Sequence, residues 1–95
     1  MICVAVTYII QQGHEAEAID LFHKMSEHTH TEPDNIMYVA HRSPNEPRRF
    51  FLHEQYKDHD ALDAHRSADY FTKYITNGLL KIAESRVAEI YEPLY

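Results

Sequence analysis

A glutamate, a tyrosine and a histidine lie close together in the segment 54–65, which reads EQYKDHDALDAH. Glu54 and Tyr56 are two residues apart at the end of an apolar run, so in a strand their side chains share one face. His65 follows Leu62 by three residues, which puts both on one face of a helix. A helix packed on this strand would bring the imidazole close to the strand end. In that arrangement His65 is a candidate proton acceptor or donor, and Glu54 is the carboxylate that orients it.

The same residues also allow a purely structural interpretation. In it, His65 is a partly buried helix histidine whose ring is satisfied by a carboxylate or a backbone carbonyl. Glu54 and Tyr56 then simply end the strand, and Asp58 or Asp60 caps the following helix. The two interpretations differ in one observable, which is whether these polar groups converge on a cavity.

Tyrosine dominates the aromatic composition, with seven Tyr, four Phe and no Trp. Tyrosine rings give a pocket apolar walls with hydroxyl tips, which suits an aromatic or quinol-like substrate. The same residues are equally suited to the interface of a dimer. The tyrosines therefore leave two alternatives open, a binding pocket and a packing surface.

Composition disfavours several classes of function. Nine Lys and Arg against fifteen Asp and Glu give a net charge of -6, which argues against a nucleic-acid surface built from clustered cations. With only two glycines, the sequence has no glycine-rich phosphate loop. The single cysteine, Cys3, leaves no intrachain disulfide and indicates a reducing compartment, so we expect a cytoplasmic protein. The apolar N-terminal run is too short to cross a membrane, and we expect no membrane partner.

Histidine is abundant, with eight residues, but the spacing does not indicate a metal site. His59 and His65 are six residues apart, a poor separation for two ligands on one helix, and neither an H-E-x-x-H motif nor a Cys/His pair occurs. No serine lies in a G-x-S-x-G turn, which disfavours a hydrolase triad. We therefore expect no metal ligands among these residues.

Hydrophobic periodicity predicts an alternation of strands and helices. Residues 2–10, 36–43, 48–56 and 81–91 are typical of strands, and the middle two form a hairpin across residues 44–47. Residues 14–28 carry a helical stripe. A second helical segment starts near Asp58, breaks near Ser67 and stops at Asn77-Gly78. The order βαββαβ is that of a ferredoxin-like α+β domain with an antiparallel sheet, here spanning residues 1–95.

The predicted sheet has an uncovered face. Two helices cover only one side of four strands, yet the strands carry apolar residues on both sides. In a chain of 95 residues the expected cover is a second copy of the same sheet. We therefore predict a homodimer through the open sheet face.

A series of residues forms a family pattern along most of the chain. It comprises Glu32-Pro33, Tyr38, Arg42-Ser43, Pro47, Phe50 or Phe51, the segment 54–65 and the aromatic Phe71 six positions after His65. In this pattern the chain resembles the antibiotic biosynthesis monooxygenase (ABM) superfamily. The resemblance implies a dimeric α/β barrel, which agrees with the fold expected from periodicity.

The resemblance also implies a function, a cofactor-independent monooxygenase that oxidises a small aromatic or quinol-type substrate. His65 and Glu54 match recurrent polar positions of the family and become the implied catalytic pair. Tyr38 and Tyr56 would line the cavity, together with Phe71. Tyr70 stands where the family often has a second histidine, so it would have to replace that residue.

Two alternatives stay open within the same superfamily. One is an isomerase or small-molecule-binding module acting on a phosphorylated signalling sugar, which would need a cation in the pocket. Arg42, Arg49 and Arg66 are the candidates for that cation. The other alternative is a non-catalytic structural dimer. The absence of tryptophan disfavours the heme-degrading branch of the superfamily.

Overall fold

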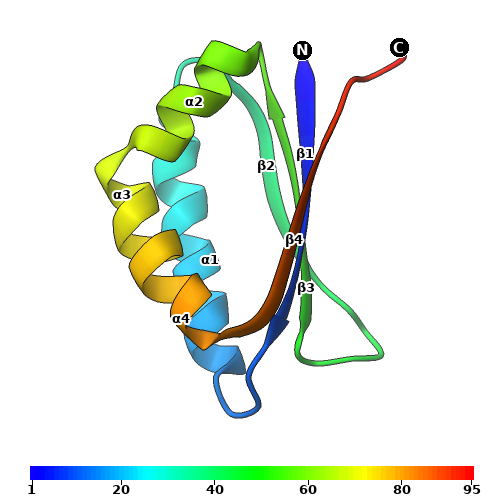
Figure 1. Ribbon diagram of the computed structural model, residues 1–95, viewed down its shortest axis with the longest axis vertical. Helices are drawn as coiled ribbons and strands as arrows, with labels where there is room; N and C mark the ends of the chain where they lie inside the picture. Colours follow the sequence, from blue (N-terminus) through cyan, green and yellow to red (C-terminus); the bar gives the residue numbers. More distant parts are fainter.

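The computed structural model describes residues 1–95 and confirms the order βαββαβ of a ferredoxin-like fold. The four strands form one antiparallel sheet in the order β2-β3-β1-β4. Figure 1 shows the helices on one side of this sheet and nothing on the other. In chain order the elements are β1 (Ile2–Ile10), α1 (Glu15–Thr29), β2 (Asn35–Arg42), β3 (Arg49–Tyr56), α2 (His59–Ser67), α3 (Asp69–Phe71), the π-helix η1 (Thr72–Leu79), α4 (Leu80–Ile82) and β4 (Ala83–Tyr91).

Strand β1 lies inside the sheet and sets which residues face the helices. Its alternate residues from Ile2 to Ile10 are at most 4% exposed, because they pack under the helices. Val4 pairs with Glu54 on β3, and Glu54 pairs with Tyr38 on β2, so the three side chains form one row across the helix-covered face. The prediction that Glu54 and Tyr56 share a face is confirmed, since both are buried on this side.

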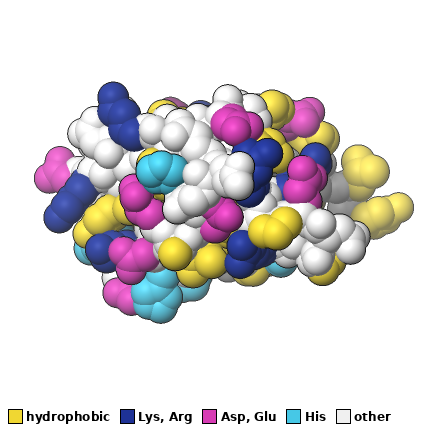
Figure 2. Space-filling view, turned by 90° about the horizontal axis from the view of Figure 1, so that it is seen from below, with side chains coloured by type: hydrophobic (Ala, Val, Ile, Leu, Met, Phe, Trp, Pro, Cys, Tyr) yellow, Lys and Arg dark blue, Asp and Glu magenta, His cyan; other side chains and the backbone are white.

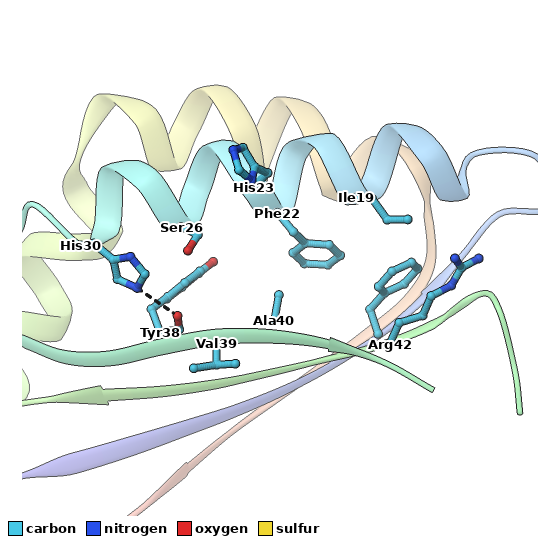
Figure 3. A pocket seen from close by; sticks show the side chains of 10 residues that line it. Ile19, Phe22, His23, Ser26, His30, Tyr38, Val39, Ala40 and Arg42 are labelled. Atoms are coloured by element: carbon cyan, nitrogen blue, oxygen red, sulfur yellow. Dashed lines mark hydrogen bonds between the residues drawn. The ribbon is translucent and has the colours of Figure 1, made fainter. Parts of the chain in front are cut away.

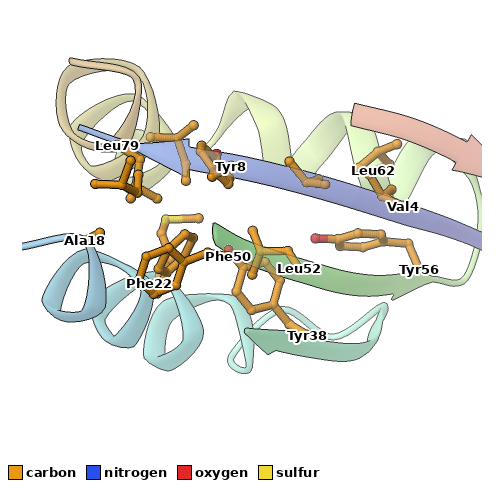
Figure 4. Packing of buried hydrophobic residues seen from close by; sticks show 14 of the residues in the cluster. Val4, Tyr8, Ala18, Phe22, Tyr38, Phe50, Leu52, Tyr56, Leu62 and Leu79 are labelled. Atoms are coloured by element: carbon orange, nitrogen blue, oxygen red, sulfur yellow. The ribbon is translucent and has the colours of Figure 1, made fainter. Parts of the chain in front are cut away.

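Aromatic and aliphatic side chains from the sheet and from α1 fill the core, as Figure 4 shows. Helix α1 buries Ala18, Phe22 and Met25, members of the stripe expected from the sequence. The Phe22 ring lies 5.4 Å from Tyr8 in an edge-to-face arrangement and 5.2 Å from Phe50. Burial of each large side chain contributes roughly 1.5–3 kcal/mol, which anchors α1 over the β2–β3 half of the sheet.

The second helical segment breaks where expected but does not end where expected. Ala68, directly after Ser67, is extended with ψ 146, which separates α2 from α3 as predicted. The predicted stop at Asn77-Gly78 is wrong, because η1 and α4 continue the helix to Ile82. A side chain at Gly78 would place its Cβ 3.3 Å from Leu21 of α1, so this glycine serves close helix packing. Tertiary packing thus outweighs the local stop signal.

The side of the sheet away from the helices carries exposed apolar side chains. They include Val39, Phe51, Val87 and Tyr91, one or more from three of the four strands. On the end of the molecule shown in Figure 2, acidic and basic side chains alternate and neither sign gathers into a patch. None of the helices combines the length and the apolar character needed to cross a membrane.

Candidate active site

His65 lies at the centre of a buried polar cluster. Asp58 caps α2 by accepting a hydrogen bond from the Ala61 amide at 2.9 Å, which fixes where the helix starts. His65, further along this helix, packs against the sheet and is 2% exposed. Its Nδ1 lies 2.8 Å from Oε2 of Glu32, and its Nε2 lies 3.8 Å from Oε1 of Glu54. The imidazole is therefore held between two carboxylates.

The two carboxylates are not equivalent partners. The Nδ1 contact to Glu32 has hydrogen-bond length, whereas 3.8 Å to Glu54 is too long for a hydrogen bond. With Glu32 accepting, Nδ1 is the donating nitrogen of the ring, and Nε2 is the nitrogen left without a close partner. Orientation of His65 was expected from Glu54, but the shorter contact belongs to Glu32.

Glu54 and Tyr56 form the inner wall of the cluster. The Tyr56 hydroxyl donates to Oε1 of Glu54 at 2.7 Å. Burial raises the pKa of the Glu54 carboxyl, although the Tyr56 hydrogen bond and the nearby His65 oppose this shift. Burial raises the pKa of Tyr56 too, and the neighbouring Glu54 adds to the effect. The Tyr56 hydroxyl thus stays protonated and remains a hydrogen-bond donor, and Glu54 holds a proton more readily than an exposed glutamate.

Aromatic rings close the cluster on the remaining sides. The His65 ring lies 5.9 Å from the ring of Tyr38, 5.2 Å from that of Tyr56 and 5.4 Å from that of Phe71, which meets it edge-on. The Tyr70 hydroxyl donates to Oε2 of Glu32, the same oxygen that binds His65. Burial and this hydrogen bond raise the pKa of Tyr70. Six of the seven residues expected in the site, His65 among them, therefore gather in one cluster.

Arg42 is the one expected site residue that does not lie in the cluster around His65. It ends β2, four residues beyond Tyr38, which is about 13 Å along a strand at roughly 3.3 Å per residue. Its Nε donates to the Pro47 carbonyl at 2.8 Å, and its guanidinium lies 5.5 Å from the centre of the Phe50 ring. Arg42 thus belongs to a different part of the helix-covered face.

That part is a groove between α1 and β2, here called the α1–β2 groove, with a volume of about 590 Å³. Figure 3 shows Ile19 and Phe22 reaching into it from α1, with Tyr38 and Ala40 reaching up from β2. Tyr38 lines this groove and also contacts His65, so its ring separates the groove from the buried cluster. The lining consists of Ile19, Phe22, His23, Ser26, His30, Tyr38, Val39, Ala40, Arg42 and Phe50.

A smaller crevice of about 110 Å³ lies at Glu32, on the other side of the cluster. Glu32 follows α1 in a loop, and its side chain keeps 16% exposure. Like half-buried Tyr70 and Phe71, it reaches solvent, and it also contacts buried His65 directly. In the sequence, Glu32 stands out only as part of the family pattern, because its 33-residue separation from His65 gives no local signal of the contact.

The polar side chains do not form a metal centre. No group of three or more His, Cys, Asp or Glu side chains is arranged to hold a metal ion. The cluster offers proton transfer instead, through an oriented imidazole with one free nitrogen, two carboxylates and two phenol donors.

Fold and cluster together define a small α+β domain with a buried histidine held between two carboxylates. The chain belongs to the family described as antibiotic biosynthesis monooxygenase, whose model matches residues 1–77. This family has the ferredoxin-like fold that forms dimeric α+β barrels, and it is named for oxidoreductase activity.

Solved structures agree on the fold over the whole chain. A crystal structure of an antibiotic biosynthesis monooxygenase is similar with a TM-score of 0.93 and 20% identity, over 100% of both chains. A protein from Shewanella oneidensis has a TM-score of 0.89 and 26% identity, over 95% of this chain and 87% of that one. A Mycobacterium tuberculosis protein has a TM-score of 0.91 and 19% identity, over 99% of this chain and 95% of that one. No curated protein matches the sequence.

Proposed function

We propose that this chain is a monooxygenase that oxidises a small aromatic or quinol-type substrate without a bound cofactor, with His65 as the general base. The observation that carries the proposal is the imidazole held by Glu32 at Nδ1, with Nε2 left without a close hydrogen bond. Such a ring is oriented to take a proton through Nε2. Family membership supports the reaction class.

In the proposed reaction the substrate supplies all the electrons. Nε2 of His65 removes the proton of a substrate hydroxyl, and the electron-rich ring carbon forms a bond to dioxygen. The resulting hydroperoxide loses its ring proton, the O–O bond breaks, and the carbon becomes a carbonyl. One oxygen atom ends in the product and the other leaves as water, so that RH₂ and O₂ give RO and H₂O. Buried Tyr56 donates its one hydroxyl hydrogen to Glu54 and so holds this carboxyl beside His65, in a buried site where hydrogen bonds are strong.

The α1–β2 groove is the proposed binding site for the substrate. It is the largest hollow of the molecule, and most of its lining is apolar or aromatic. Tyr38 stands between this groove and His65. We therefore propose that the Tyr38 ring turns aside when substrate binds, which brings a substrate hydroxyl to Nε2.

Oxygen uptake tests the proposed function. The purified protein is incubated with a series of hydroquinones, and uptake is compared with the same solutions without protein. Substitution His65→Ala should lower the rate by about a hundredfold or more, since it removes the base. His59→Ala, in the first turn of the same helix, is the matched control and should keep the rate. No uptake above background, or full uptake by His65→Ala, would reject the proposal.

A binding module without oxidation is the second candidate, and the closed cluster favours it. His65 is almost fully buried and already lies between two carboxylates, which is what a structural histidine requires. In that case a ligand should raise the melting temperature while no oxygen is consumed. A phosphorylated sugar is the least suited ligand, because Arg42 is the one arginine that lines the groove.

We further propose a homodimer through the open sheet face, which would complete the barrel typical of the family. Exposed Phe51 and its apolar neighbours on this face favour a second sheet as cover. Light scattering should give twice the chain mass of 11.2 kDa. Phe51→Glu should yield a monomer, whereas Leu80→Glu, equally apolar and exposed but on α4, should stay dimeric. A folded wild-type monomer would contradict this interface.

A further inference from the structure

We propose that the substrate carries a carboxylate on its aromatic ring system, and that Arg42 binds this carboxylate at one end of the α1–β2 groove. The inference rests on the proposed function, because it takes the groove as the substrate-binding site. It adds the chemical class of the substrate, an aromatic carboxylate, and the residue that selects it.

Arg42 is held in place without being neutralised. Its one side-chain hydrogen bond runs from Nε to the Pro47 carbonyl, and its guanidinium lies over the Phe50 ring. Both terminal nitrogens therefore remain free to donate. By contrast, Arg48 pairs with Glu84 at 2.7 Å and Arg49 pairs with Glu46 at 3.1 Å. Two parallel donors on a fixed guanidinium match the two oxygens of a carboxylate.

The charges around the groove leave Arg42 as its anion-binding group. No aspartate or glutamate lines the groove. Of its two histidines, His23 already pairs with Glu27 at 2.6 Å, and His30 Nε2 lies 3.1 Å from the Tyr38 carbonyl. Glu15 lies in the adjoining hollow at Arg42, where it accepts a hydrogen bond from the Gly13 amide at 2.6 Å. An anion placed beside Arg42 thus meets a free cation within the groove.

The rest of the lining indicates an aromatic body for the ligand. Phe22 and Phe50, with ring centres 5.2 Å apart, lie along the groove together with Ile19 and Ala40. Aromatic rings pack well on such a surface. Sugar hydroxyls would find few partners there, and a phosphate dianion would have one unpaired arginine to neutralise it. The lining therefore fits an aromatic carboxylate better than a phosphorylated sugar.

Calorimetric titration with redox-inert probes tests this inference separately from oxygen chemistry. The probes are 1-naphthoate and 1-naphthamide, which differ in the charged group alone, and ribose 5-phosphate. Wild-type protein should bind the naphthoate about tenfold more tightly than the amide, a difference of about 1.4 kcal/mol. In Arg42→Gln the two naphthalene probes should bind alike. Amide signals of Ser26 and Ala40 in NMR spectra should shift with either probe.

Arg66→Gln is the matched control, because Arg66 is also an exposed arginine without an ion pair but lies on α2, outside the groove. It should keep the tenfold preference. Equal binding of both naphthalene probes by wild type, no binding of either, an unchanged preference in Arg42→Gln, or tighter binding of ribose 5-phosphate would each overturn the inference. Oxygen uptake with uncharged hydroquinones is measured independently, so these results would overturn the carboxylate preference and, where neither probe binds, the groove as the binding site, but not the proposed oxidation at His65.

Discussion

The helix-covered face of the sheet has two unlike halves. Under α2 and α3 it is polar and closed, with His65 2% exposed and Glu54 5% exposed. Under α1 it is mostly apolar and hollow, with a groove of about 590 Å³. The half that holds the buried His65 thus offers only a small crevice of about 110 Å³, and the half with the larger hollow has no buried acid–base pair. Tyr38 contacts both halves and is the one ring that separates them.

The difference has a physical cause. Buried carboxylates and a buried imidazole lose hydration, and this loss is offset only if they contact one another. The Glu32, His65, Glu54 and Tyr56 groups do so, and in doing so they fill their own space. Apolar side chains need no hydrogen-bond partners, so the mostly apolar groove under α1 can stay open. Function in this protein would then require that a ligand in one half gains access to the other.

Next to His65→Ala, Glu32→Gln should have the largest effect on the polar half, because it changes the contact that orients His65. The amide oxygen of the new glutamine can still accept a hydrogen bond from Nδ1 of His65, but it carries no charge to stabilise a protonated ring. Oxygen uptake with hydroquinones should therefore fall by at least about tenfold. The pH profile of the residual rate should also shift. Asp34→Asn, on the same loop, is the control and should behave as wild type. Equal rates in both variants would show that Glu32 does not support His65.

Tyr38→Ala should remove the separation between the halves. Modification of His65 by diethyl pyrocarbonate, followed by mass spectrometry of its peptide, should become about tenfold faster, because the ring that shields it is gone. The variant should also lose roughly 3 kcal/mol of stability through the cavity it creates. Tyr38→Phe retains the ring and should leave His65 protected. Equal protection in both variants would mean that other side chains close the cluster.

Ile19→Trp should affect the hollow half alone. Ile19 is 46% exposed on α1 and points into the groove in Figure 3, so an indole there should occupy part of the binding space. We expect KM to rise about fivefold with kcat nearly unchanged, because the substitution weakens binding of the substrate and of the transition state equally. Leu80→Trp, at an exposed position on α4, should change neither constant. A fall in kcat with constant KM would place the substrate elsewhere.

Sequence patterns were sufficient to predict which strand and helix residues face the polar half. The alternation along β1 and the spacing of Glu54 and Tyr56 fix which side chains lie under the helices, since a strand has a strict period of two. The three-residue spacing of Leu62 and His65 does the same for α2. These are local rules, and the structure follows them.

The features that escaped prediction depend on tertiary contacts. Glu32 reaches His65 across 33 residues, through a loop whose path no periodicity describes. Arg42 shares a face with Tyr38, but the sequence does not say how far along β2 the helices close over it. Gly78 has the composition of a helix stop, yet it lies inside a helix because Leu21 needs the space. In each case the partner is distant in the chain.

Glu54→Gln should give the smallest effect, a change in the pH dependence of stability. Burial raises the pKa of Glu54 above 4.5, so the folded chain keeps a proton that the unfolded chain releases. Stability from this carboxyl is therefore complete below pH 4.5 and is lost as pH rises through the folded pKa. The substituted amide cannot ionise but can still accept from Tyr56. The melting temperature of the variant relative to wild type should thus rise with pH. A constant difference from about pH 4 to about pH 8 would show that ionisation of Glu54 does not destabilise the folded chain.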